Sequence, residues 1–297
     1  MKKQNGITLV DTIILVIILC VALFFWAQYT FNNHPQYRPM CGTNLKGLGT
    51  AMQVYANDYD GRCPQLRGTG PWSKELGFAY DMSKPDFSPQ GAQGNTPRTV
   101  TASWYLLVRE VDVSPSSFIC PQSNQKAFGG KHPKYEDLIQ FWDFGPNPYA
   151  HVSYAMHNPY SRFPASVYAK KEGFSSFAVA ADMNPWFKDG DIQPPGPSGT
   201  SPQIITLTDK VTWLLGMAPF HVIGEKTKTP EGQNVLYADG HTSYETQPNI
   251  GVSNDNIYTF WSTDDNPTDQ DKQGGTAPTG RTPENDAKSE EDSFLVL

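Results

Sequence analysis

The sequence lacks the short motifs by which many enzymes and nucleic-acid-binding proteins are recognised. It has no nucleophile elbow, no phosphate-binding loop and no tandem metal motif, so we expect neither an enzyme nor a bound cofactor. Charged residues make up only 18% of the 297 residues and sum to −7, and no basic patch with interleaved aromatic residues occurs. This charge balance argues against nucleic-acid binding.

Basic residues are also missing between Lys3 and Arg38, and this gap contains a long apolar run. Residues 7–31 are almost wholly apolar, and a helix rising about 1.5 Å per residue over that length can cross a bilayer core of about 30 Å. Two lysines precede the run. The positive-inside rule therefore predicts that residues 1–6 face the cytoplasm and that the chain after about residue 32 lies outside.

Two kinds of cleavable signal fit this run poorly. A secretory signal peptide needs a shorter apolar run followed by a small-x-small cleavage site, and no such site follows. A lipoprotein signal ending at Cys20 needs a small residue before the cysteine, and Leu19 is not small. Neither interpretation accounts for Gly6 or Asp11.

The segment 6–11, Gly-Ile-Thr-Leu-Val-Asp, resembles the processing site of type IV prepilins and type II secretion pseudopilins. Their pattern is a short basic leader, Gly, a hydrophobic residue that is usually Phe, Thr, Leu, an aliphatic residue and Glu, followed by an apolar helix. Here Ile7 replaces the Phe and Asp11 replaces the Glu. The resemblance implies that a prepilin peptidase cuts after Gly6 and that the new amine of Ile7 is methylated.

Asp11 places a carboxylate inside an apolar segment. At mid-membrane such a group costs roughly 2.5–3.5 kcal/mol on insertion scales, and it costs less near the cytoplasmic end. One interpretation is a side chain that reaches the membrane interface. We favour a second one, in which Asp11 attracts the positive amine of Ile7 in a neighbouring subunit and sets the axial register as a subunit enters a filament.

Cysteines are few, and no Cys-x-x-Cys spacing supports a zinc site. Cys20 lies in the apolar run, whereas Cys41, Cys63 and Cys120 are expected on the oxidising side of the membrane, where disulfides persist. We expect one disulfide and one free thiol. Cys63–Cys120 is the favoured pair, because both residues precede proline in loops whereas Cys41 lies on a helical face.

The exterior part of the chain contains many Gly and Pro residues, 25 of each in the whole sequence, and is expected to be loop-rich and β-leaning. Pro35 and Pro39 predict a break where the chain leaves the membrane. An amphipathic helix is then expected within residues 32–61. Its apolar stripe should lie against a sheet and consists of Cys41, Leu45, Leu48, Met52 and Tyr55.

Two patterns within residues 62–261 have both a structural and a functional interpretation. One is an aromatic group that either packs under loops, which we favour, or forms a carbohydrate platform: Phe141, Trp142, Phe144 and Tyr149. The other is the Asp239-Gly240 step between two β-rich runs, which predicts a hairpin. A metal site made of His221, Asp239 and His241 is the interpretation that we rank below the hairpin.

Later residues are similar to a large pilin-like subfamily. Its helix after the membrane anchor resembles residues 41–64, its middle resembles Phe-Ile-Cys-Pro at 118–121, and its ending resembles Asn-Val-Leu-Tyr-Ala-Asp-Gly-His at 234–241. The likeness touches scattered blocks of residues 1–247. A charged insertion at 225–231 replaces the short Gly-rich linker of that subfamily.

Residues 262–297 are polar and acidic, with few basic residues. We expect an acidic, flexible and solvated tail that cannot bury a core. Its apolar end at 294–297, Phe-Leu-Val-Leu, either frays or docks onto a neighbour or onto the sheet edge of its own domain, and the sequence favours neither.

These features predict an α+β fold in five parts: leader 1–6, transmembrane helix 7–31, amphipathic helix 32–61, globular pilin-like β-domain 62–261 and tail 262–297. The resemblance implies a structural subunit, a pilin or pseudopilin, of a cell-surface or secretion-associated filament. Its partners would be other pilin-like subunits, a prepilin peptidase and an assembly platform with a cytoplasmic ATPase.

The same resemblance implies a location. Before assembly the protein would be a single-pass inner-membrane protein with its C-terminus outside the cytoplasm, and after assembly it would belong to an extracellular or periplasmic filament. Two alternatives come from other classes. One is an unprocessed, membrane-anchored binding module that uses the aromatic loops, and the other is an anchored metal-dependent hydrolase.

Overall fold

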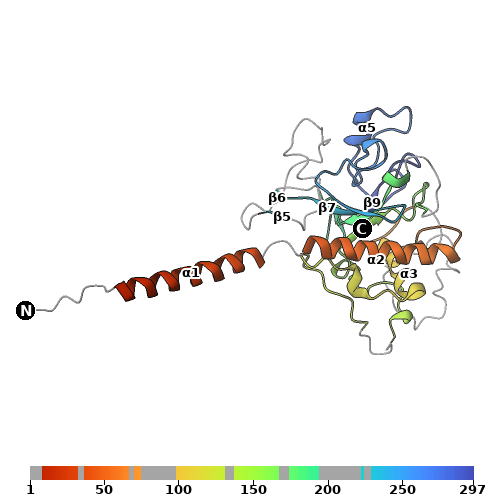
Figure 1. Cartoon of the computed structure of the whole chain (residues 1–297). Coiled ribbons are helices and arrows are strands. Elements are labelled where there is room, and N and C mark those ends of the chain that lie inside the picture. The colour runs from red at the N-terminus through yellow and green to blue at the C-terminus, as the bar shows by residue number, and fades with distance from the viewer. Residues whose placement is uncertain are drawn as a thin grey trace, which may run out of the picture. The chain divides into compact units, whose positions relative to one another are not determined.

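The computed structural model describes residues 9–32, 37–66, 70–74, 98–130, 137–166, 174–193, 222–223 and 229–297 (Figure 1). The chain divides into two compact units, residues 1–36 and 37–297, and each is described by itself. The fold is mixed α+β, with an apolar N-terminal helix in the first unit and an antiparallel sheet in the second. Gly6, Ile7 and His221 lie outside the described residues.

The first unit contains one described helix, α1 (Leu9–Asn32), which is 24 residues long. The second unit is built on a five-stranded antiparallel sheet with the strand order β8-β7-β2-β1-β9. These strands are β1 (Tyr154–His157), β2 (Ala178–Asp182), β7 (Gln233–Tyr237), β8 (Thr242–Glu245) and β9 (Leu295–Val296).

Two short antiparallel pairs accompany the main sheet. They are β3 (Phe187–Lys188) with β4 (Asp191–Ile192), and β5 (Val222–Ile223) with β6 (Thr229–Pro230). In the main sheet every residue of β1, β2 and β7 is buried, whereas β8 at the edge is half-buried. Strands that are buried on both faces need other parts of the protein packed against each side of the sheet. In this unit one side is covered by a helix and the other by the C-terminal segment (Figure 1).

Helix α2 (Tyr37–Asp58) covers one face of the sheet against β7 and β8, and helix α3 (Val100–Val111) packs on the other side of α2 (Figure 1). The predicted apolar stripe is confirmed, because all five of its residues are buried. Pro39 stands in the first turn of α2, where a missing backbone donor breaks no helical hydrogen bond.

A glycine lets α2 approach the sheet closely. A Cβ added at Gly49 would stand 2.6 Å from Leu236 Cδ1 on β7. At Gly47 on the same helix an added Cβ would meet no atom within 4 Å. A side chain is therefore excluded by close packing at Gly49 but not at Gly47, although both glycines lie in the same helix.

The predicted hairpin is confirmed between β7 and β8. Gly240 has φ +84°, a conformation that glycine adopts without a Cβ clash, and its N–H donates to Tyr237 O at 2.8 Å. Tyr237 N–H in turn donates to His241 O at 3.0 Å, which closes the loop.

The aromatic residues after α3 pack inward. Phe141, Phe144 and Tyr149 are at most 2% exposed, and Phe144 makes an edge-to-face contact with Phe118, whose ring centroid is 5.0 Å away. Among the described residues from 115 to 176 are four short 3₁₀ helices: η2 (Pro115–Phe118), η3 (Leu138–Gln140), η4 (Pro148–Ala150) and η5 (Phe174–Ser176). The packing interpretation is supported for these three rings. Trp142, the fourth residue of the group, is half-buried, with the Arg109 guanidinium 3.6 Å from its ring centroid.

The expectation of a solvated tail at 262–297 is wrong. Phe294, Leu295, Val296 and Leu297 are at most 1% exposed, and β9 pairs with the edge of β1, matching Met156 with Val296. The docking alternative, onto the domain's own sheet edge, is the one observed. In Figure 1 the blue C-terminal segment lies across the sheet from α2 and includes η6 (Val252–Asn254) and α5 (Asp269–Gln273).

Buried carboxylates explain how an acidic segment can pack. Asp292 Oδ2 accepts hydrogen bonds from the backbone N–H groups of Trp261 at 3.0 Å and Lys288 at 2.7 Å. Asp255 accepts from Ser293 N at 2.7 Å and from Trp261 Nε1 at 2.8 Å. These acids thus bind backbone and indole donors of the segment itself. Burial raises the pKa of Asp292 to about 7, and burial with the nearby charge of Asp292 raises the pKa of Asp255.

Candidate functional site: an apolar helix and a buried cysteine pair

Helix α1 is apolar around its whole circumference. Its segment Leu9–Trp26 has a mean hydropathy of 2.8, and none of these 18 residues is buried. A helix that packs one face against a soluble core has a polar face opposite, and α1 has none in this segment. Its 24 residues span about 36 Å, which is long enough for one membrane crossing or a signal anchor.

Asp11 is the only charged residue between Leu9 and Asn32, and it lies in the first turn of α1. The first backbone N–H groups of a helix have no intrahelical acceptor and carry the positive end of the helix dipole. A carboxylate in this turn is therefore stabilised locally. The same position leaves it close along the chain to Ile7, the residue at which the predicted processing would create an amine.

Asp239 and His241 form a local contact in the β7–β8 turn. Asp239 Oδ1 accepts the His241 backbone N–H at 2.9 Å and lies 2.5 Å from His241 Nδ1. Partial burial acts to raise the pKa of Asp239, but the hydrogen bonds and charge of His241 outweigh it and lower the pKa. Both side chains are about half exposed, and the His241 ring stacks on Tyr237. This arrangement is that of a turn-stabilising pair.

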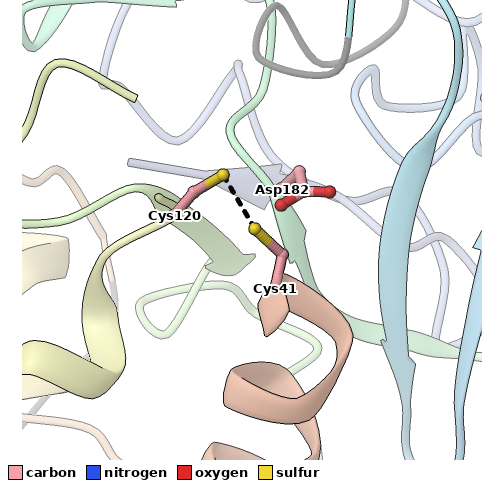
Figure 2. Close-up of side chains that lie close together, drawn as sticks. All are labelled: Cys41, Cys120 and Asp182. Carbon is pink, nitrogen blue, oxygen red and sulfur yellow. Dashed lines mark hydrogen bonds between the residues drawn. The ribbon is translucent and has the colours of Figure 1, made fainter. Parts of the chain in front are cut away.

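Three potential metal ligands do gather elsewhere in the described part of the chain. Cys41 Sγ, Cys120 Sγ and a carboxylate oxygen of Asp182 all lie within 4.8 Å of one another, and all three residues are buried (Figure 2). Cys41 comes from the first turns of α2, Cys120 follows η2, and Asp182 ends β2. Asp239 and His241 are not part of this group.

The two sulfurs, which we call the cysteine pair, are 2.8 Å apart. The structure does not support the predicted pairing of Cys63 with Cys120, because the sulfur beside Cys120 is that of Cys41. Cys63 and Cys120 each precede a proline, but this shared local motif does not indicate how far apart their sulfurs lie in the fold. The apolar stripe of α2, in contrast, carries Cys41 directly to the sheet next to Cys120.

Polar groups hold the surroundings of the cysteine pair in place. Asn44 Nδ2 donates to Ile119 O at 3.0 Å and to the Tyr154 hydroxyl at 3.3 Å. Asp182 Oδ2 accepts from the backbone N–H and the side-chain amide of Asn234, at 2.6 and 3.1 Å. Helix α2, the segment before Cys120 and strands β1, β2 and β7 are therefore tied together around the two sulfurs.

Sequence reasoning missed this cluster. The available signal was the odd number of exterior cysteines, with Cys41 at the beginning of an apolar stripe and Asp182 at the end of a buried strand. Nothing in the spacing of these residues says that they meet.

No protein-family model, curated protein or solved structure matches the chain. The resemblance to pilins accordingly remains a prediction that rests on the quoted residues.

Proposed function

We propose that this protein is a pilin-like structural subunit, a pilin or pseudopilin, of a cell-surface or secretion-associated filament. The observation that carries the proposal is α1, a helix with exposed apolar side chains on all sides and one carboxylate in its first turn, directly after the Gly6–Ile7 step. Removing so many large apolar side chains from water is worth on the order of tens of kcal/mol. Lipid supplies this burial before assembly, and neighbouring α1 helices supply it in a filament.

Processing prepares α1 to move from lipid into contact with neighbouring α1 helices. Cleavage after Gly6 removes the lysine-bearing leader and creates a positive amine on Ile7. Asp11 of one subunit then pairs with the Ile7 amine of the next in a low-dielectric setting, where opposite charges attract more strongly than in water. The pairing selects one axial register among neighbouring helices.

The second unit fits the role of a filament coat. It consists of a helix laid on an antiparallel sheet, with the sheet's other face covered by the C-terminal segment, so the described strands β1, β2 and β7 are buried within the chain itself. The proposal includes the partners that such assembly needs: a prepilin peptidase, other pilin-like subunits, and an inner-membrane assembly platform with its ATPase. It includes no nucleic acid and no catalytic step.

Mass spectrometry of the N-terminal peptide tests the proposal. The full chain is produced in a host that contains a prepilin peptidase, alongside Gly6→Val and the matched control Asn5→Ala. We expect the wild type and Asn5→Ala to begin at a methylated Ile7, and Gly6→Val to keep its leader. A wild-type chain that begins at Met1 would contradict the proposal and favour a membrane-anchored binding module.

The hydrolase alternative has its own test. It predicts retained zinc and a hydrolytic activity that His241→Ala abolishes. Our proposal predicts that His241→Ala changes the β7–β8 turn alone and leaves processing intact, because His241 contacts its own turn.

A further inference from the structure

The cysteine pair joins two segments that are distant in sequence. Cys41 and Cys120 are 79 positions apart, yet their sulfurs face each other at 2.8 Å between α2 and the chain after η2 (Figure 2). Both residues are 0% exposed. Neither the predicted pairing nor the proposed filament function accounts for this contact.

We propose that Cys41 and Cys120 form the native disulfide of unit 37–297. The inference uses one element of the proposed function, the location of this unit outside the cytoplasm, where disulfides persist. The bond requires the two thiol sulfurs to close from 2.8 Å to about 2.04 Å. Cys63 keeps its thiol.

A shared metal ion fits the same side chains less well. A tetrahedral zinc with Zn–S bonds of about 2.3 Å holds two thiolate sulfurs about 3.8 Å apart. The observed sulfurs lie closer than that. Asp182 Oδ2 accepts two hydrogen bonds from Asn234, which fasten β2 to β7, so a metal ligand from this carboxylate would have to be Oδ1.

The reaction is a thiol–disulfide exchange with a protein or small-molecule disulfide as oxidant. One cysteine, as its thiolate, attacks the oxidant's disulfide and forms a mixed disulfide, which releases one oxidant sulfur as a thiol. The second cysteine then attacks the mixed disulfide at the first cysteine's sulfur and releases the other. Two protein thiols lose two electrons and two protons, and the oxidant gains both as two thiols.

The timing of this reaction follows from burial. The hydrogen bond between the two thiols, burial and the nearby Asp182 charge raise the pKa of Cys41 far above its ordinary value. A buried, protonated thiol is a poor nucleophile. The bond therefore forms while the chain folds, and once formed it is shielded from reductants.

The bridge has a mechanical consequence. Cys41 lies about one helical turn after α2 begins at Tyr37, which is where the chain enters unit 37–297. Any pull on α1 reaches the domain through this turn. A covalent bond from Cys41 to the chain after η2 holds the beginning of α2 in place when the connecting segment is loaded.

Peptide mapping of native full-length protein tests the inference. Membranes are extracted in N-ethylmaleimide and digested with chymotrypsin, which places Cys41, Cys63 and Cys120 in peptides 38–45, 60–66 and 119–128. We expect the first and third peptides joined and Cys63 alkylated. Alkylation of both Cys41 and Cys120, a Cys63–Cys120 linkage, or one zinc per chain with unlinked sulfurs would overturn the inference.

A second measurement is independent of the filament. The full-length Cys20→Ser variant is reduced, unfolded in urea with detergent and refolded in a glutathione buffer. Chain entropy alone favours the shortest loop, Cys41–Cys63. We expect Cys41–Cys120 to predominate by roughly tenfold because the fold brings these residues together, and a mixture in which Cys41–Cys63 leads would contradict the inference.

Reduction gives the matched comparison. Each protein is first reduced with dithiothreitol in urea, where the bond is accessible, and then refolded with dithiothreitol still present. Compared with the unreduced protein, this treatment is expected to lower the Tm of the wild type and of Cys63→Ser, and to leave that of Cys41→Ser unchanged. An unchanged wild-type Tm would overturn the inference. A chain that starts at Met1 but carries the Cys41–Cys120 linkage would refute processing and retain the disulfide, so the two proposals fail separately.

Discussion

The two units of this chain hold the same kinds of large apolar side chain in opposite environments. In α1 the side chain of Phe25 is 66% exposed, whereas Trp104 and Phe294 in unit 37–297 are fully buried. The second unit has a sheet whose two faces both find cover within the chain. Helix α1 exposes apolar side chains along Leu9–Trp26, and under the proposed function lipid or other α1 helices bury them. The comparison shows that apolar content alone does not distinguish a core from an assembly surface.

The largest effect on stability is expected at the C-terminus. Phe294→Ala removes a fully buried ring that contacts Phe260 edge to face, and should lower the free energy of unfolding by about 3–5 kcal/mol. The control Glu291→Ala changes an exposed side chain in the same segment and should stay within about 0.5 kcal/mol. Denaturant unfolding in detergent measures both. Equal stabilities of Phe294→Ala and Glu291→Ala would indicate that this segment is a solvated tail.

A charge placed on an exposed apolar residue should act differently in the two units. Ile17 in α1 is 56% exposed and Val54 in α2 is 48% exposed. Ile17→Arg should cost about 2.5–3.5 kcal/mol of membrane insertion, roughly a hundredfold, because it lies mid-segment. Val54→Lys should have no effect on insertion. Fractionation of membranes after carbonate extraction compares them, and equal membrane retention would break the distinction between the units.

A smaller loss is expected where α2 meets the sheet. Gly49→Ala forces a methyl group into Leu236 and should destabilise the second unit by about 1–3 kcal/mol. Gly47→Ala meets open space and should stabilise the helix by about 0.5–1 kcal/mol. The two substitutions change the stability in opposite directions only if α2 packs on β7 as described. Thermal unfolding of both variants measures these changes.

A further effect is a pH dependence from one buried carboxyl, which is small over any one pH unit. Burial raises the pKa of Asp143 to about 7, although Thr99 and Thr101 donate to it. In the unfolded chain an Asp titrates near about 3.9, so between these values the folded state keeps a proton that the unfolded state loses. Stability therefore falls as pH rises from 4 to 7, by up to about 1.4 kcal/mol per pH unit from this group.

Asp143→Asn removes that contribution and should flatten the profile. Asp255 and Asp292 act in the same direction, and His157, whose pKa burial lowers, acts against them below pH 6.5, so the difference between the wild type and the variant isolates Asp143. The exposed Asp189→Asn serves as the control and should keep the wild-type slope. Parallel profiles for the wild type and Asp143→Asn would contradict a buried, protonated Asp143.

Local periodicity predicted much of the fold. The i, i+4, i+7 stripe from Cys41 to Tyr55 gave the buried face of α2, the Asp239-Gly240 step gave the β7–β8 turn, and the uninterrupted apolar run gave α1. Each of these features depends on neighbours within a few residues. Sequence patterns report such neighbours directly.

The features that were missed depend on distant partners. For residues 294–297 the sequence favoured neither fraying nor docking, whereas their backbone pairs with β1. Buried acids such as Asp292 satisfy backbone donors in a segment whose charge suggested solvation. Cys41 and Cys120 meet only because α2 and the chain after η2 converge beside β2. No local pattern encodes that convergence.

The central claim is that α1 leaves the lipid by packing against other α1 helices. Cryo-electron microscopy of filaments sheared from cells that produce the full chain tests it most directly, with Asp11→Ala in parallel. We predict a filament with α1 helices bundled along its axis, residues 37–297 on its outside and Asp11 next to a neighbouring Ile7, and no filament from Asp11→Ala. Dispersed membrane particles from the wild type, or wild-type and Asp11→Ala filaments that are alike, would contradict the account.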